Sequence, residues 1–267
     1  MQLAHRLGQA MARGQRVWLF LDYDGTLAEF APTPDVVLPN PQVIDLLRSL
    51  ARLAELRITI LSGRRLAHIR QLVPVAGIAL SGTYGIEMIT REGQAVDLLD
   101  YDSQRPVLDR IRPQWAALIE GRQGFYLEDK GWTLAIHARR AEPHEGEHVL
   151  AEARKVIQRA APPDTFRLEE GYRFIEIAPT LADKGQAIAM LLERYAWPGA
   201  KPVYIGDDDK DEPAFAMINR HGGVSILVSN EERPTQAGYR LPDPAQVHRW
   251  LRTVLESYRQ AGSAAAG

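Results

Sequence analysis

The sequence has no cysteine, no strong excess of one charge and no long apolar run. Without cysteine, disulfides, thiolate metal sites and a cysteine nucleophile are excluded. The net charge is -2, from 32 basic and 34 acidic residues, so we expect neither a nucleic-acid partner nor binding to an anionic membrane. No apolar run approaches the roughly 18 residues of a membrane span, and the N-terminus lacks a signal peptide's order of parts. We therefore expect a soluble, cytoplasmic protein, and we take it to be a monomer.

The most informative stretch begins with five apolar residues at 17–21 and continues into two acids, Asp22 and Asp24. Such a run suits a strand buried on both faces of a parallel sheet. Parallel sheets bind ligands at the carboxyl ends of their strands, so Asp22 and Asp24 should lie together at that edge. Two like charges this close are costly unless they share a cation. A hard divalent cation with oxygen ligands fits them, and we favour magnesium.

Strand and helix patterns alternate on both sides of a middle segment, which predicts an α/β fold with a right-handed parallel sheet. Strands are expected at 17–21, 57–61, 78–80, 202–205, 224–228 and 239–241. Helices are expected at 3–12, around Val43 to Ala51, and at 65–72, 184–195 and 244–258, with a short one after 212. A proline-rich loop is expected at 31–41 and a frayed, low-complexity tail at 261–267.

The middle segment has a different rhythm, in which helix, hairpin, helix and hairpin follow one another. The second hairpin should turn at Glu170-Gly171. This order predicts a small antiparallel α+β unit, and a chain of 267 residues is long enough for two domains. We therefore predict a first domain formed by residues 1–102 and 180–267, with a second domain inserted at 103–179.

A second acidic cluster, with five acids in the six positions 207–212, directly follows an apolar strand. If the strands at 17–21, 57–61 and 202–205 are neighbours, their ends bring together six side chains: Asp22, Asp24, Ser62, Lys184, Asp207 and Asp208. That set suits a phosphate, because a metal can bridge a carboxylate and a phosphate oxygen while an ammonium and a hydroxyl position the other oxygens. The best nucleophile is then a carboxylate, with Asp22 attacking phosphorus and Asp24 acting as acid and base.

The sequence resembles the phosphatases of the haloacid dehalogenase superfamily in four motifs that occur in the family's order: Asp22-Tyr23-Asp24-Gly25-Thr26, Ser62-Gly63-Arg64, Lys184-Gly185 and Gly206-Asp207-Asp208. The inserted segment is similar to the α/β cap of that superfamily's sugar phosphatases. The resemblance implies a Rossmann-like parallel-sheet core with an inserted α+β cap domain. Taken alone, Ser62 could merely cap a helix and Lys184 could be a solvated helix residue, but their places in the motif order favour the site.

More narrowly, residues 206–212 and the segment Leu127-Glu128-Asp129-Lys130-Gly131, with His137 and Arg139, are similar to trehalose-6-phosphate phosphatases. This resemblance implies that Asp22, the backbone carbonyl of Asp24 and Asp207 hold magnesium, and that Asp208 and Asp211 support this metal site. It also implies two sets of substrate-binding residues: Thr26, Ser62, Gly63, Arg64 and Lys184 in the core, and Glu128, Lys130 and Glu176 in the cap.

The expected reaction is hydrolysis of trehalose 6-phosphate to trehalose and phosphate through an aspartyl-phosphate. The alternatives are a phosphatase for another sugar or glyceryl-glycoside phosphate, a catalytically silent sugar-phosphate-binding domain, and a phosphomutase. The sequence departs from the family pattern at Lys210, where threonine is usual, and at Tyr84, where histidine is usual. Neither position is an expected nucleophile or metal ligand, so both bear first on the identity of the sugar phosphate.

Overall fold

A computed structural model describes residues 1–29 and 37–265 of the protein. The chain forms two compact units, a core unit of Met1–Val96 with Asp183–Gly267 and an insert unit of Asp97–Ala182. Most of the proline-rich loop expected at 31–41, and the last two residues of the expected tail, lie outside the described residues. The α/β fold class predicted from the sequence is confirmed.

In the described part of the core unit, the strands form an eight-stranded sheet with the order β12-β11-β10-β1-β2-β3-β4-β5. Its strands are β1 (Val17–Leu21), β2 (Leu56–Leu61), β3 (Ala79–Gly82), β4 (Glu87–Ile89), β5 (Ala95–Asp97), β10 (Lys201–Gly206), β11 (Val224–Val228) and β12 (Tyr239–Leu241). Pairing is parallel from β12 through β3, and β4 runs antiparallel to β3. The two short strands β4 and β5 extend the sheet beyond the predicted set.

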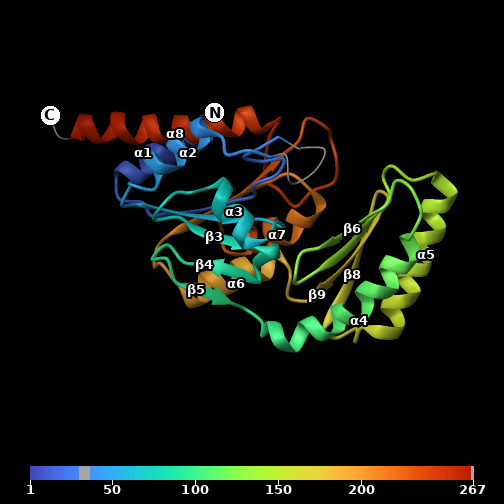
Figure 1. Ribbon diagram of the computed structural model, residues 1–267. Helices are drawn as coiled ribbons and strands as arrows, with labels where there is room; N and C mark the ends of the chain where they lie inside the picture. The colour runs from blue at the N-terminus through green and yellow to red at the C-terminus, as the bar shows by residue number, and fades with distance from the viewer. Residues whose placement is uncertain (30–36, 266–267) are drawn as a thin grey trace. The chain divides into compact units, whose positions relative to one another are not determined.

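The central strand β1 is buried on both faces, as its unbroken apolar run predicts. Leu19 and Leu21 join a cluster with residues of α1 (Gln2–Ala12), α2 (Pro41–Leu50) and α8 (Pro244–Ala265). Phe20 is on the opposite side and pairs in register with Tyr204, whose ring packs edge-on against Phe215 of α7 (Glu212–Arg220). Figure 1 shows α1, α2 and α8 on one side of the sheet and α6 (Lys184–Arg194) with α7 on the other. The strand ends are therefore fixed by packing from both faces.

The C-terminal helix α8 is longer than predicted, because it continues past Tyr258 to Ala265, into the tail that was expected to fray at 261–267. The first helix lies along α8, and His5 Nδ1 is 2.8 Å from Ser257 Oγ. Among residues 1–29 and 37–265, no helix is both long and apolar enough to span a membrane.

The insert unit is a four-stranded antiparallel sheet with two helices on one face. Its elements are α4 (Tyr101–Ile119), β6 (Tyr126–Asp129), β7 (Leu134–His137), α5 (Pro143–Ala160), β8 (Phe166–Gly171) and β9 (Phe174–Pro179), with the strand order β6-β7-β9-β8. The helices meet at Trp115, whose fully buried indole donates a hydrogen bond to the carbonyl of Ala153. The predicted order of helix, hairpin, helix and hairpin is confirmed.

The turn of the second hairpin was predicted wrongly. Gly171 is the last residue of β8 and pairs with Phe174, so the chain turns at Tyr172 and Arg173, not at Glu170-Gly171. Arg173 takes the positive φ of the turn, 57°, although a glycine stands two positions earlier. A side chain at 171 would lie within 2.0 Å of the Phe174 ring. This glycine is therefore required by close packing across the hairpin, which the sequence pattern does not distinguish from a turn.

Candidate active site

The condition on which the predicted site depends is met by the sheet order. β1 pairs with β2 on one side and with β10 on the other, all in parallel. Their carboxyl ends therefore share one edge, where Asp22, Ser62 and Asp207 follow the three strands. The sheet topology thus brings the first, second and fourth sequence motifs to the same place.

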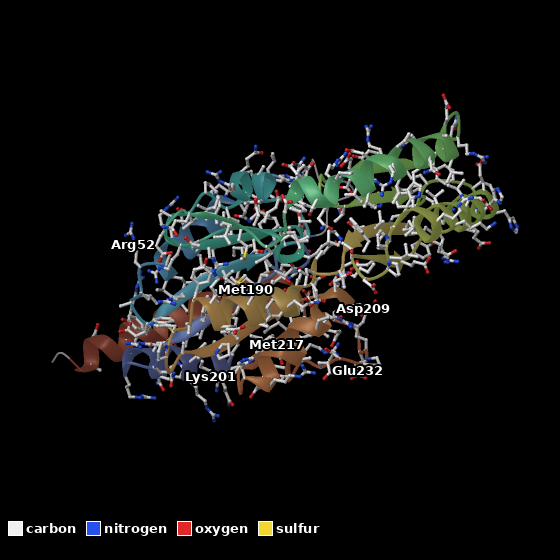
Figure 2. All side chains as sticks on the ribbon, turned by 90° about the horizontal axis from the view of Figure 1, so that it is seen from below. Arg52, Met190, Lys201, Asp209, Met217 and Glu232 are labelled. Atoms are coloured by element: carbon white, nitrogen blue, oxygen red, sulfur yellow. The ribbon has the colours of Figure 1, made fainter. Side chains whose placement is uncertain are left out.

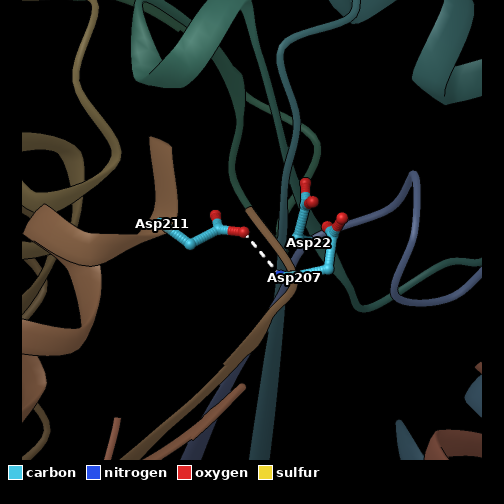
Figure 3. Close-up of side chains that lie close together, drawn as sticks. All are labelled: Asp22, Asp207 and Asp211. Carbon is cyan, nitrogen blue, oxygen red and sulfur yellow. Dashed lines mark hydrogen bonds between the residues drawn. The ribbon is translucent and has the colours of Figure 1, made fainter. Parts of the chain in front are cut away.

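Three carboxylates form a compact cluster at this edge: Asp22, Asp207 and Asp211 (Figure 3). One oxygen from each side chain lies within 4.8 Å of the others. Asp22 is 5% exposed and Asp211 is fully buried. The hydroxyl of Thr26 donates a hydrogen bond to Asp207 at 3.4 Å. Oxygen donors at this spacing could hold a hard divalent cation.

Asp211 has a different role from the other two acids, because its oxygens are already occupied. One oxygen accepts hydrogen bonds from Lys184 and Tyr204, each at 2.5 Å. The other accepts from the backbone N–H groups of Asp207 and Asp208, at 2.7 and 3.1 Å. A side chain on Gly206 would come within 2.5 Å of this carboxylate. Asp211 therefore organises the turn that carries Asp207.

Lys184 is the cation of the cluster and is itself only 3% exposed. It lies in the first turn of α6, which begins at the N-cap Asp183. Its ammonium is 2.9 Å from Asp22 and 2.5 Å from Asp211. A lysine that is solvated on a helix surface is thus excluded at this position. Its charge is committed to the carboxylates that it joins.

The cluster has more negative than positive charge, and this imbalance raises the pKa values of two of its carboxyl groups. Burial raises the pKa of Asp22 to about 7, opposed by Lys184 and reinforced by the neighbouring acids. Burial and the nearby Asp22 raise the pKa of Asp207 further, to about 10. Burial would also raise the pKa of Asp211, but the Lys184 ammonium and its other donors hold it below the usual value. The first two carboxyl groups therefore favour protons or a cation.

Asp24, the predicted acid and base, is held by Arg64 in a two-pronged ion pair. Arg64 Nε and Nη2 each donate to one oxygen of Asp24 at 2.7 Å. The guanidinium also lies 3.2 Å from Nδ1 of His68, one turn along the chain. The structure thus places the predicted substrate-binding residue Arg64 against Asp24. This pairing was not foreseen from the sequence.

Ser62 and Gly63 lie in the segment between β2 and α3 (Leu66–Leu72). The Ser62 side chain is fully buried, and its hydroxyl accepts a hydrogen bond from the backbone N–H of Arg64 at 3.1 Å. This bond shapes the segment locally and does not cap α3, whose first residue Leu66 instead donates to Glu87 at 3.1 Å. Asp208 accepts from the backbone N–H of Lys210 at 2.9 Å and so caps the following turn.

The predicted cap residues gather on one face of the insert sheet. Glu128, Ala135, Glu176 and Glu169 are successive cross-strand neighbours. Lys130 Nζ is 2.9 Å from Glu176 and 3.7 Å from Glu128. The small Ala135 between the two acids leaves room for this ammonium above the sheet. The insert unit therefore carries a charged face opposite its helices.

His137 extends this face, since its Nε2 is 2.9 Å from Glu128. The imidazole is stacked between Tyr126 and Phe174, with ring centres 5.9 and 6.0 Å away. Although burial opposes it, the His137 bond and the Lys130 charge lower the pKa of Glu128. Glu128 is thus held as a carboxylate that can accept hydrogen bonds.

Sequence reasoning missed Tyr204 and Glu87, both of which hold other site residues. Tyr204 reads as one more apolar strand residue, and nothing marks its hydroxyl as a partner of Asp211. Glu87 follows the third strand motif and ties Thr83 to the start of α3. Only the three-dimensional contacts give these two residues their roles.

Because Asp211 is buried and accepts four hydrogen bonds, we predict that Asp211→Asn lowers the stability of the protein strongly. The amide keeps one oxygen but turns an NH2 group toward donors, and Lys184 loses the charge of its nearest partner. We expect the free energy of unfolding to fall by about 3–5 kcal/mol. Urea denaturation at pH 7 measures this change. Asp209→Asn is the matched control, because the Asp209 side chain is 93% exposed (Figure 2). Equal stabilities of the two variants would contradict the role of Asp211 in organising this turn.

The sequence matches the family model described as trehalose-phosphatase over residues 20–245. It is 32% identical over 243 residues to trehalose-6-phosphate phosphatase of Escherichia coli (strain K12), in a match that spans 90% of this chain and 87% of the relative. It is also 32% identical over 262 residues to trehalose-phosphate phosphatase B of Arabidopsis thaliana, covering 93% of this chain and 69% of the relative.

Among solved structures, the C-terminal domain of trehalose-6-phosphate phosphatase from C. albicans aligns with a TM-score of 0.79 at 22% identity. That alignment covers 94% of this chain and 96% of the other, and it shows a shared fold. The family match extends over the carboxylate cluster, the Lys184 segment and the whole insert. This chain therefore belongs to the trehalose-phosphatase family.

Proposed function

We propose that this protein is a magnesium-dependent phosphatase that hydrolyses trehalose 6-phosphate to trehalose and phosphate. The observation that carries the proposal is the pair of neighbouring carboxylates Asp22 and Asp207, which lies at the same edge of the sheet as Lys184 and Ser62. Phosphoryl transfer needs positive charge around the phosphate and a nucleophile beside it. The relatives' names supply the sugar, since they are trehalose-phosphate phosphatases.

The donor set of the cluster fits magnesium. Asp22 and Asp207 are oxygen donors whose pKa values are raised in the absence of a cation, because burial and mutual repulsion disfavour their charges. Asp208 and the backbone carbonyl of Asp24 are further candidate ligands. Asp211 supports the metal site through its hydrogen bonds to the 207–208 backbone. When bound, magnesium would supply positive charge to the phosphate oxygens.

In the first half of the reaction, an oxygen of Asp22 attacks phosphorus and the bond from phosphorus to the sugar oxygen breaks. Asp24 gives a proton to the departing sugar oxygen, so the sugar leaves as an alcohol. Both oxygens of Asp24 are engaged by Arg64, and one of these bonds must open for Asp24 to carry that proton. Lys184 keeps Asp22 oriented and partly balances its charge.

In the second half, Asp24 takes a proton from a water molecule as the water oxygen attacks phosphorus. The bond between phosphorus and Asp22 then breaks, which releases inorganic phosphate and restores both aspartates. Ser62, Gly63 and Thr26 are proposed to help hold the phosphate end of the substrate. Uncatalysed hydrolysis of phosphate monoesters is very slow, so the reaction needs a large rate enhancement, to which covalent catalysis and a bound metal would both contribute.

We assign the charged face of the insert unit to the sugar. Glu128 and Glu176 offer carboxylate oxygens to sugar hydroxyl groups, and Lys130 offers an ammonium donor between them. Carboxylates and ammonium groups make charge-assisted hydrogen bonds, which are stronger than neutral ones. The expected monomeric state and cytoplasmic location stay predictions.

The function is tested by phosphate release from a panel of sugar phosphates, with magnesium or with EDTA. We expect release from trehalose 6-phosphate that EDTA abolishes. Asp22→Asn should lower turnover by about 10⁴-fold or more, because the amide cannot form the acyl phosphate. Asp209→Asn is the control and should retain turnover. Phosphate release from no member of the panel would favour a sugar-phosphate-binding domain, and retained turnover in folded Asp22→Asn would remove Asp22 as nucleophile.

The role of the insert face is tested by Glu128→Ala. We expect KM for trehalose 6-phosphate to rise roughly 10- to 100-fold, because a charged hydrogen-bond acceptor is lost. KM for p-nitrophenyl phosphate, which has no sugar, should change by less than about twofold. Glu147→Ala, at an exposed position of α5, is the matched control. A similar rise in KM for both esters would remove Glu128 from sugar recognition.

A further inference from the structure

Lys210 and Tyr84, the two positions that depart from the family pattern, contact each other. Lys210 Nζ donates to the Tyr84 hydroxyl at 2.8 Å and lies 4.6 Å from the centre of the Tyr84 ring. Tyr84 follows β3 and Lys210 follows β10, and β1 and β2 lie between these strands in the sheet. The contact therefore spans the strand ends that carry Asp22 and Ser62.

Tyr84 is fixed against the 62–64 segment by its backbone and by its ring. Its N–H donates to the carbonyl of Ser62 at 2.9 Å, and the N–H of Thr83 donates to the carbonyl of Arg64 at 2.8 Å. The ring lies directly over Gly63, where an added Cβ would be 2.6 Å from ring atoms. A residue larger than glycine at 63 would displace the ring. The ring is thus packed and hydrogen-bonded against the 62–64 segment.

The backbone at Thr83 and Tyr84 is held in a conformation that these residues avoid. Their φ values are 48° and 56°, in the left-handed region, and threonine is β-branched. Such strain persists where the surroundings determine it, and it clusters at functional sites. Here the surroundings include the hydrogen bond from the Thr83 hydroxyl to Glu87 at 2.9 Å. The local fold therefore stabilises a strained turn that presents the Tyr84 hydroxyl.

Lys210 is fixed on the other side of the site, in the turn at 207–211. Its backbone N–H donates to Asp208 at 2.9 Å, within the capping arrangement that also includes Asp211. Asp207 is bound to the same turn through its N–H group and Asp211. A side chain that leaves this turn and ends on Tyr84 therefore links Asp207 to the 62–64 segment.

We propose that Tyr84 and Lys210 are positioning residues whose contact ties the 62–64 segment to the 207–211 turn. This tie fixes the separation between the side of the site assigned to the phosphate and the side assigned to the metal. The inference rests on the proposed function, because it assigns a purpose to a contact within that site. Since this contact positions the groups around the phosphate and not those around the sugar, it should matter equally for phosphate esters with and without the sugar. A small misplacement of catalytic groups is enough to slow a reaction strongly.

The test combines Tyr84→Phe, Lys210→Met and the double variant with orthovanadate, a mimic of the phosphoryl group in transfer. Tyr84→Phe keeps the ring over Gly63 and removes the hydroxyl that accepts from Lys210, and Lys210→Met keeps the aliphatic stem. Each single variant should lower kcat/KM about tenfold for trehalose 6-phosphate and for p-nitrophenyl phosphate alike. Each should also weaken vanadate binding in the presence of magnesium about tenfold. The double variant should lose no more than either single one, because both remove the same tie.

Tyr239→Phe and Lys201→Met are the matched controls, since Tyr239 is 53% exposed on β12 and Lys201 starts β10 far from its carboxyl end (Figure 2). Thermal denaturation of every variant shows whether the fold is kept. A merely structural role would lower the melting temperature without the shared, non-additive loss of vanadate binding. Losses that multiply to about 100-fold in the double variant, or single variants within twofold of the native protein, would overturn the proposal.

Vanadate binding also separates this proposal from the proposed function. Isothermal titration with vanadate and magnesium needs no turnover, so it can be measured even if no sugar phosphate is hydrolysed. Native protein that binds vanadate but releases no phosphate would refute the function while the tie is still tested by the variants. Native protein that turns over, with both single variants unaffected, would refute the tie alone.

Discussion

The arrangement of the site depends on an excess of negative charge at the carboxyl end of β1. Two buried carboxylates, Asp22 and Asp211, contact the ammonium of Lys184, and the partly exposed carboxylate of Asp207 lies beside them. Asp211 takes most of the Lys184 charge through short hydrogen bonds, so its neighbours have raised pKa values. Burying carboxylates in this way is costly unless a cation joins them.

The same excess of negative charge links the parts of the site to one another. The turn at 207–211 is held together because the Asp211 carboxylate accepts hydrogen bonds from the backbone N–H groups of Asp207 and Asp208. Arg64 forms an ion pair with Asp24, the second acid of the first motif, so the charge of Asp24 is balanced by a guanidinium. Asp22 and Asp24 therefore lie in different electrostatic surroundings. Different surroundings are what the two different roles proposed for these aspartates need.

The sequence predicted much of this arrangement because its signals are local. An unbroken apolar run identifies a buried parallel strand, and acids that follow such strands predict where carboxylates meet, so the proximity of Asp22 and Asp207 could be predicted. Roles set by contacts between distant residues were not found. The hydroxyl of Tyr204, the fork of Arg64 on Asp24 and the contact of Lys210 with Tyr84 join elements far apart in the chain. The hairpin turn at Tyr172 was missed because a glycine often marks a turn, whereas Gly171 lies in the strand and packs closely against the Phe174 ring.

The central claim is that the metal-free cluster of Asp22 and Asp207 holds protons that a divalent cation displaces. Calorimetric titration with magnesium at pH 7, in buffers of different ionisation enthalpy, measures this exchange most directly. Because the pKa values of both carboxyl groups are raised, binding should release protons at pH 7. The affinity should also fall as the pH is lowered through 7, because protons then compete more strongly. Binding with no proton release and no pH dependence, or no binding of magnesium, would contradict this account of the site.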